Sequence, residues 1–379
     1  MPSFSGSPMP PGTLRGSVLG ADGWLSGTVR FGARIGEISG DALHAPRPGE
    51  DLILPGFIDL HVHGGGGADI MDGDGAIDIV ARVHAGFGTT SLLATTMTAP
   101  RDSIEHALRD VGRAIRTRTP GGARVLGTHL EGPYISPSRL GAQPANARVG
   151  TIEELSVFNE LAPIRVLTLA PEVAGHLDFV RALKIAGILP QIGHSSGSYE
   201  EGVAALEAGA AGFTHLFNAM SELHHRRPGM VGAALAHAHY AELIPDLLHV
   251  HPGAIRAAMR AIPRLYCVTD STAAAGMPDG EYHLGSHTVT KCLGGVRLPD
   301  GTLAGSTLTT DKAFRNLVSI GLDPADAARR LSTYPADYLG LEDRGRIAPD
   351  CWADLVVMSP DYKLKAVFIE GESIELAHA

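Results

Sequence analysis

The chain has 379 residues, 44% of them hydrophobic, which suits one large α/β domain with a small companion. Its net charge of -10 argues against nucleic acid and anionic membranes as partners, so an anionic small molecule would need a local cationic pocket. Three widely spaced cysteines disfavour a zinc–thiolate site and fit a reducing compartment. With no signal-peptide pattern and no long apolar run, we expect a cytoplasmic location.

Both ends of the chain predict short strands rather than helices. Residues 1 to about 17 are rich in Pro, Ser and Gly, and we expect them to be disordered. Short apolar runs separated by Gly turns follow as far as Ile53 and return after residue 345. The simplest arrangement is a small β-sandwich module formed by both chain ends, 1–55 plus 345–379.

Between residues 56 and 344, apolar strands alternate with helical stretches. This alternation predicts an α/β domain of the closed (β/α)8 TIM-like barrel type, with an open doubly wound sheet as the alternative. We expect helices over 76–85, 102–118, 175–186, 199–208, 311–321 and 323–334. The eight strand candidates are 53–62, 88–96, 124–131, 164–170, 189–194, 212–215, 242–249 and 265–270.

The first strand candidate ends in two histidines, His61 and His63. Residues i and i+2 of a strand point to the same face, so the two imidazoles would project together. The glycines 64–67 that follow leave open space beside them. Such a pair can present nitrogen ligands to a divalent metal. Taken alone, the motif fits two surface histidines before a flexible loop equally well.

Other metal-type side chains also lie at the ends of strand candidates. In a (β/α)8 barrel the carboxyl ends of the strands meet at one face, where catalysis occurs. Each residue has an ordinary alternative: a structural histidine, a carboxylate at a helix N-terminus, or an N-cap. Their joint occurrence at successive strand ends favours a divalent metal site instead. The residues are Glu131, His194, His215, His249 and Asp270.

Several longer motifs resemble the N-acetylglucosamine-6-phosphate deacetylase family of the amidohydrolase superfamily. They occur in the family's order from about residue 50 to residue 350, and the second and fourth are quite specific to these deacetylases. The motifs are Pro-Gly-Phe-Ile-Asp-Leu-His-Val-His-Gly at 55–64, His-Leu-Glu-Gly-Pro-Tyr at 129–134, Gly-His-Ser at 193–195, Thr-His-Leu-Phe-Asn-Ala-Met at 214–220, His-His-Arg at 224–226, Pro-Gly at 228–229, Leu-His-Val at 248–250, Val-Thr-Asp at 268–270 and Leu-Ala-Gly-Ser at 303–306.

The resemblance implies metal-dependent hydrolysis of N-acetylglucosamine 6-phosphate to glucosamine 6-phosphate and acetate, in amino-sugar catabolism or cell-wall sugar recycling. It implies a first metal on Glu131, His194 and His215. Because His61 and His63 are both retained, the resemblance leaves either one or two ions open, with Glu131 as the bridge when a second ion binds. Zinc is the metal that we expect, with Fe, Mn or Co as alternatives. Asp270 would act as general base and then as general acid.

The resemblance also implies a homodimer and a site for the phosphorylated sugar. Arg226 would bind the phosphate, by analogy across the dimer interface. Two positions depart from the family pattern: Leu247 stands where Gly is usual, and Arg227 where Glu is frequent. Neither change removes a catalytic group. The residues expected to bind substrate are Ala142, Asn218, Ala219, Arg226 and His249.

Two rival interpretations remain open. The chain could be a different amidohydrolase, such as a dihydroorotase or an aminoacylase-like enzyme, which a spectrum of acetamido and cyclic-amide substrates would distinguish. It could also be a catalytically inactive barrel used as a scaffold. Such proteins typically lose metal ligands, whereas this sequence keeps all of the expected ligands and the general base.

Overall fold

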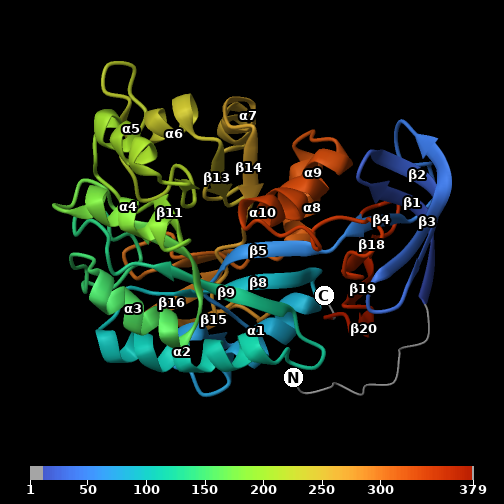
Figure 1. The fold of residues 1–379 in the computed structure, drawn as a ribbon, viewed down its shortest axis with the longest axis horizontal. Coiled ribbons are helices and arrows are strands. Elements are labelled where there is room, and N and C mark those ends of the chain that lie inside the picture. The colour runs from blue at the N-terminus through green and yellow to red at the C-terminus, as the bar shows by residue number, and fades with distance from the viewer. Residues whose placement is uncertain (1–11, 378–379) are drawn as a thin grey trace.

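The computed structural model describes residues 12–377, and both termini are drawn in Figure 1. The expected disorder of residues 1–11 lies outside the described residues. For residues 12–17 the expectation is wrong, because they belong to strand β1, Gly12–Gly20. This strand pairs along its whole length with β2, Gly23–Phe31, in antiparallel register from Gly12–Phe31 to Gly20–Gly23.

Strands from both ends of the chain form one seven-stranded sheet (Figure 1). The two ends meet where β4 pairs with β1 in parallel and with β18 in antiparallel orientation. Hydrogen bonds join all seven strands into a single sheet, and the two-layer sandwich stays a prediction. The order is β20 (Glu372–Ile374), β19 (Leu364–Ile369), β18 (Leu355–Met358), β4 (Leu52–Pro55), β1, β2 and β3 (Ile35–Leu43).

The first strand candidate, 53–62, is two strands rather than one. β4 ends at Pro55 in the seven-stranded sheet, and β5, Phe57–Val62, begins the next sheet. Gly56 is the junction: its N–H donates to the Asp354 carbonyl, and a Cβ there would lie 2.3 Å from the Thr90 hydroxyl oxygen. The expected domain boundary at 55/56 stays a prediction, although it coincides with this change of sheet.

Six parallel strands follow one another in the second sheet, in the order β12-β11-β10-β9-β8-β5. Almost all of their residues are buried, which is typical of parallel strands covered on both faces. The α/β class with a parallel sheet is therefore confirmed. Their bounds are β8 Thr89–Thr96, β9 Arg124–Glu131, β10 Ile164–Leu169, β11 Leu189–Ile192 and β12 Gly212–Phe213.

Two further parallel strands, β13 (Tyr240–Leu243) and β14 (Arg264–Cys267), complete the eight expected strands. Both end earlier than the sequence predicts, because the segments 244–249 and 268–270 turn away as loops. The Leu216 N–H donates to the Glu242 carbonyl on one side of this pair. On the other side, the Asp270 N–H donates to the His61 carbonyl. These bonds link the pair to both edges of the six-stranded sheet.

Helices connect most of the parallel strands, and the predicted ones are present. The expected helix 323–334 is two helices, because the backbone of Ser332 leaves the helical region. Three helices were not predicted, among them α6, which is Gly- and Ala-rich and buried without an amphipathic pattern. The helices are α1 Ala76–Ala85, α2 Arg101–Arg116, α3 Ile152–Leu161, α4 His176–Ile185, α5 Tyr199–Ala208, α6 Gly229–His237, α7 Pro252–Ala261, α8 Thr310–Ser319, α9 Pro324–Leu331 and α10 Thr333–Tyr338.

Short elements lie near the carboxyl ends of the parallel strands. Among them is a three-stranded antiparallel sheet within residues 280–297. Within the described residues, no helix combines the length and apolar character needed to cross a membrane. The short elements are β6 (Gly64–Gly65), β7 (Ala68–Asp69), the 3-10 turn η1 (Ile70–Asp72), β15 (Gly280–Leu284), β16 (His287–Cys292) and β17 (Gly295–Arg297).

An ion-pair cluster, which we call the basal cluster, joins the seven-stranded sheet to the start of β9. The Arg124 Nε and Nη2 atoms donate to the Glu370 Oε1 and Oε2 atoms, respectively, each at 2.8 Å. Arg344 binds Glu370 at 2.5 Å and also pairs with Asp354, and the Arg118 Nε lies 3.4 Å from Glu370. Three cations and two carboxylates therefore pair at the amino end of the parallel strands, with Glu372 completing the cluster beside Arg118.

Candidate metal centre and active site

Sharp turns at strand ends present the candidate side chains. His194, His215 and Asp270 have φ angles of 47°, 27° and 50°, in the left-handed region that residues other than glycine seldom adopt. Backbone strain of this kind is common where a fold must aim a side chain at a functional site. Each of the three residues follows the end of a parallel strand, and the positive φ turns the chain so that the side chain lies at the carboxyl end of the sheet.

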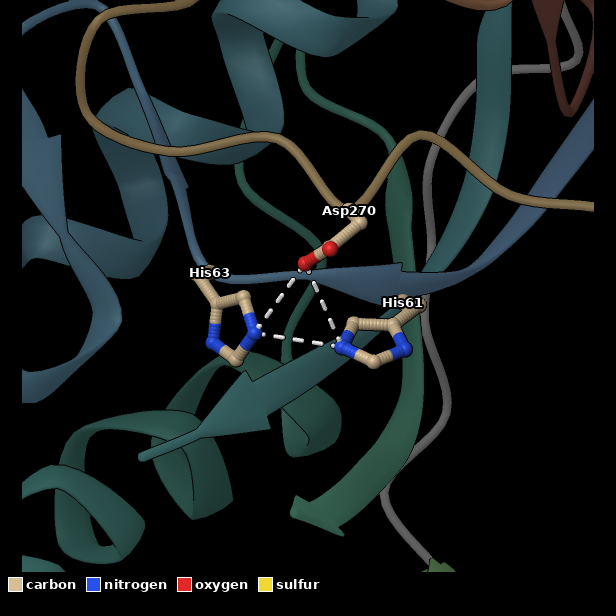
Figure 2. A group of neighbouring side chains, drawn as sticks. All are labelled: His61, His63 and Asp270. Atoms are coloured by element: carbon tan, nitrogen blue, oxygen red, sulfur yellow. Dashed lines mark hydrogen bonds and ion pairs between the residues drawn. The ribbon is translucent and has the colours of Figure 1, made fainter. Parts of the chain in front are cut away.

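His61, His63 and Asp270 form one candidate metal-binding group (Figure 2). The two Nε2 atoms lie 3.1 Å apart, and the Asp270 Oδ1 is 3.5 Å from that of His61 and 3.3 Å from that of His63. Figure 2 shows both rings coming from the end of β5, with Asp270 facing them from the loop after β14. The prediction that residues i and i+2 present imidazoles to one shared point is confirmed.

Glu131, His194 and His215 form a second group beside the first. The Glu131 Oε1 lies 3.2 Å from the His194 Nε2 and 3.0 Å from the His215 Nε2. Its other oxygen, Oε2, lies 3.2 Å from the His63 Nε2. Glu131 thus contacts both groups, as expected for a carboxylate that would bridge two ions. We call these six residues together the carboxyl-end site.

The donor set of the carboxyl-end site fits divalent metal ions. Four imidazole Nε2 atoms and two carboxylates converge, and all six residues are less than 10% exposed. The paired ring nitrogens lie 3.1 Å apart in both groups, so each pair offers two nitrogen ligands to one shared ion once the rings have lost their extra protons. No lysine or arginine lines the cavity among the described residues, so no side-chain cation occupies this point.

The close packing of imidazoles and carboxylates in this site shifts their pKa values. Burial lowers the pKa of His63, but hydrogen bonds to Asp270 and Glu131 outweigh it and raise the pKa to about 9. Burial raises the pKa of Asp270, and the imidazoles of His61 and His63 more than reverse this, so that the pKa lies below its ordinary value. Asp270 is therefore a carboxylate at neutral pH. A metal that binds His63 must displace a proton from it.

His249 does not end the seventh strand, as the sequence predicted, but lies six residues beyond it. Asp246 places it there: its Oδ1 accepts the backbone N–H groups of Leu248 and His249, and its Oδ2 lies 2.7 Å from the His249 Nδ1. The intervening Leu247 has a φ of 66°, a conformation that costs a residue with a side chain more than the glycine usual in the family.

A cavity of about 230 Å³ lies against the carboxyl-end site, a size that suits one small molecule rather than a polymer. Four of the expected substrate-binding residues line it, namely Ala142, Asn218, Ala219 and His249. Arg226 does not; it lies exposed in the segment before α6, beside Arg227. Within one chain the structure thus brings together every predicted site residue except Arg226, whose role stays a prediction.

Two residues of the site were not predicted. The Gln143 Nε2 donates to the Glu131 Oε2 at 2.5 Å, while its side-chain oxygen accepts the Thr98 N–H at 2.7 Å. No local pattern marks Gln143, because it lies in an irregular loop. Asp246 could have been found, since an aspartate in a turn often accepts the backbone N–H two residues further along, here that of Leu248.

The comparisons with known proteins agree with this site. A model of the amidohydrolase family matches residues 52–374, so the chain belongs to that family. The chain is 39% identical to N-acetylgalactosamine-6-phosphate deacetylase of Escherichia coli O157:H7, over 85% of this chain and 87% of that protein. It is also 39% identical to N-acetylglucosamine-6-phosphate deacetylase of Vibrio furnissii, over 85% of this chain and 82% of that protein.

Solved structures give the same result. An N-acetyl-D-glucosamine-6-phosphate deacetylase variant of Mycobacterium smegmatis, in complex with N-acetyl-D-glucosamine-6-phosphate, superposes with a TM-score of 0.89 at 32% identity. This match covers 97% of this chain and 99% of that one. The corresponding enzyme of Thermotoga maritima gives a TM-score of 0.87 at 33% identity, over 96% and 99% of the two chains. The chain is therefore a hydrolase of the deacetylase type.

Proposed function

We propose that the protein hydrolyses the acetamide bond of N-acetylglucosamine 6-phosphate, releasing acetate and glucosamine 6-phosphate, with the help of a divalent metal. The observation that carries this proposal is the placement of Asp270 beside two ligand groups that share Glu131. Relatives that cover most of the chain are named for this reaction, which supports the same substrate class. A scaffold without activity would have no reason to keep this donor set.

A divalent metal, when bound, supplies a nucleophile from water at neutral pH and polarises the carbonyl group. Glu131, His194 and His215 would hold the first ion, and His61, His63 and Asp270 form the donor group for a second. Nitrogen-rich sites with carboxylates are well suited to zinc, and Fe, Mn or Co bind similar donors. We therefore infer zinc as the resident metal, in one or two copies.

Asp270 would carry the proton through the reaction. As a carboxylate at neutral pH it can accept the proton of the attacking water, and it can then deliver that proton to the leaving nitrogen. His249 would help to hold the sugar and the developing oxyanion. Because its Nδ1 donates to Asp246, its Nε2 is left to face the cavity.

We also propose an architecture and an assembly for the chain, in line with its family membership. We infer that the six- and two-stranded sheets close into one (β/α)8 barrel, 56–344, and that 1–55 and 345–379 form the companion module. The hydrogen bonds on both sides of the β13–β14 pair support this closure. We further infer a homodimer in which Arg226 reaches the partner's phosphate pocket, a cytoplasmic location, and a role in amino-sugar catabolism or cell-wall sugar recycling.

Acetate release tests the proposed reaction. Purified protein should release acetate from N-acetylglucosamine 6-phosphate, lose this activity after chelation, and regain it when Zn²⁺ or Co²⁺ is added. Unphosphorylated N-acetylglucosamine serves as the control and should react far more slowly. Activity that is indifferent to chelation would remove the metal from the mechanism. Turnover of dihydroorotate or of acyl amino acids, with no acetate release from the sugar, would identify a different amidohydrolase.

N-Acetylgalactosamine 6-phosphate is a second candidate substrate. The relative of this name from Escherichia coli O157:H7 is as similar in sequence, at 39% identity, as the relative from Vibrio furnissii that is named for N-acetylglucosamine 6-phosphate. The two sugars differ only in the configuration of one hydroxyl group, so both place the acetamide and the phosphate similarly. Values of kcat/KM measured for both sugars in parallel decide the preference: a higher value for the galactosamine compound would make it the principal substrate.

A further inference from the structure

A cluster of buried polar side chains lies behind His61, on the side away from the cavity. It consists of Glu242 on β13, Gln191 on β11 and Tyr266 on β14, each 0% exposed. None of the three lines the cavity or takes part in the proton transfers proposed above. Burying a carboxylate such as that of Glu242 costs free energy unless its charge and its hydrogen-bonding capacity are satisfied. Its contacts therefore indicate what it does in the fold.

Both carboxylate oxygens of Glu242 are engaged. Its Oε2 lies 3.0 Å from the His61 Nδ1 and accepts the backbone N–H of His215 at 3.3 Å. Its Oε1 accepts the Gln191 side-chain amide at 2.9 Å, and the Tyr266 hydroxyl lies 3.2 Å from it. Gln191 and Tyr266 thus fix the carboxylate from behind, and the carboxylate in turn fixes the imidazole.

This contact determines which ring nitrogen of His61 carries the proton. Because a carboxylate can only accept, Nδ1 must be the donor, and the lone pair of Nε2 is left to face His63 and Asp270. Other rings of the carboxyl-end site lack such support: the Nδ1 atoms of His63 and His215 are buried without a hydrogen-bond partner among the described residues. The His194 Nδ1 donates to a neutral acceptor, the Arg139 carbonyl, at 2.9 Å.

We propose that Glu242, held by Gln191 and Tyr266, is a positioning residue that orients His61 for a second divalent ion in the His61–His63–Asp270 group. In this arrangement the chain binds two ions, and the affinity of the second ion depends on Glu242. The inference rests on the proposed metal-dependent hydrolysis. Its physical basis is general: a carboxylate behind a ligating histidine fixes the ring and increases its basicity.

Stepwise Co²⁺ binding to metal-stripped protein tests this role, with metal analysis and visible absorption as readouts. Wild-type protein should bind two ions. Glu242→Gln keeps the size of the side chain but removes its charge, and should weaken the second binding step about 10- to 100-fold while leaving the first unchanged. Glu172→Gln is the matched control, because Glu172 accepts hydrogen bonds from Ser195 and Ser196 but contacts no imidazole.

Tyr266→Phe provides a second, milder variant, which decides the matter if Glu242→Gln fails to fold. It leaves the carboxylate in place and removes one neighbouring hydroxyl, so the second step should weaken only several-fold. Three results would overturn the proposal: one ion in wild-type protein, an unchanged second step in both variants, or equal weakening of both steps. Acetate release by the same wild-type samples tests the proposed function separately, since a one-metal deacetylase would still release acetate.

Discussion

Strand β9 carries a charged cluster at each end, and the two clusters satisfy their carboxylates in different ways. At its amino end, Arg124 belongs to the basal cluster, where Glu370 receives hydrogen bonds from two guanidinium groups. At its carboxyl end, Glu131 belongs to the carboxyl-end site, where imidazoles surround it. The carboxyl-end site is the more deeply buried of the two, and only the basal cluster contains permanent cations.

This difference suits the basal cluster to stabilising the fold and the carboxyl-end site to metal binding and chemistry. A guanidinium is always charged and binds a carboxylate through two parallel hydrogen bonds, so the basal cluster is complete within the protein. Imidazoles are charged only when protonated, and their Nε2 lone pairs are free for a metal when they are not. The carboxyl-end site therefore balances its carboxylates with protons that a metal ion can displace. In parallel α/β folds, chemistry at the carboxyl end and stability at the amino end are a general division.

The largest expected effect is that of Glu131→Gln. Because Glu131 contacts both ligand groups, its neutralisation should remove both ions and reduce kcat/KM by more than about 10⁴-fold. Metal analysis and acetate release measure the two results. The matched change at the other end of the fold, Glu370→Gln, removes the same charge and should leave bound metal and kcat unchanged. Equal loss of metal in both variants would contradict the separation of the two clusters.

Asp270→Asn should have the next largest effect. An amide can accept a hydrogen bond but cannot take up and deliver a proton, so kcat should fall about 10²- to 10⁴-fold. The first ion, on Glu131, His194 and His215, should remain bound. Single-turnover acetate release together with metal analysis distinguishes lost proton transfer from lost metal. Near-normal turnover would show that another group carries the proton.

Much of the carboxyl-end site could be predicted because strand-end positions are encoded locally. The His61–Val62–His63 spacing determines that both rings share a face, and each other ligand follows a recognisable apolar run. The spacing alone left two surface histidines as an equal alternative. The structure supports the metal-binding interpretation, because Asp270 and Glu131 from distant parts of the chain lie within 3.5 Å of the same ring nitrogens.

What the sequence did not predict depends on contacts between distant residues. Gln143 lies in a loop and contacts Glu131. Glu242 lies inside a short strand and contacts His61. Neither position carries a local sequence signal of its role. Helix α6 was not predicted because it is apolar on all sides and so lacks the amphipathic pattern that marks a surface helix. The two ends of the expected 53–62 strand lie in different sheets, since hydrogen bonds from the C-terminal strand β18 engage its first half.

Glu370→Gln should act on stability instead of chemistry. Burial raises the pKa of Glu370, but Arg124 and Arg344 outweigh it and hold the pKa below its ordinary value. Its contribution is therefore present above the unfolded pKa of about 4.5 and is lost as pH falls through the folded pKa. At pH 7 the variant should lose about 2 kcal/mol of unfolding free energy, less than for a fully buried pair, because Glu370 is partly buried and solvent screens its ion pairs.

Denaturant unfolding at several pH values measures this effect. The difference between wild type and Glu370→Gln should be largest near neutral pH and should shrink as the pH is lowered below the ordinary range of a glutamate. Lys363, whose ion pair with Asp361 is exposed, offers a comparison, since Lys363→Met should change stability far less than Glu370→Gln does. A pH-independent difference for Glu370→Gln would show that packing rather than charge stabilises the basal cluster.

The smallest effect is expected for Arg226→Ala, a variant that tests whether the substrate cavity is complete within one chain. The lining of the cavity contains no arginine or lysine, yet a phosphorylated substrate brings negative charge to it. If the partner subunit supplies Arg226, the variant should raise KM about tenfold, ~1.4 kcal/mol, with little change in kcat. Arg227→Ala removes the same charge one residue away and should leave KM nearly unchanged. An unchanged KM for Arg226→Ala would mean that backbone N–H groups and His249 bind the phosphate without help from a second chain.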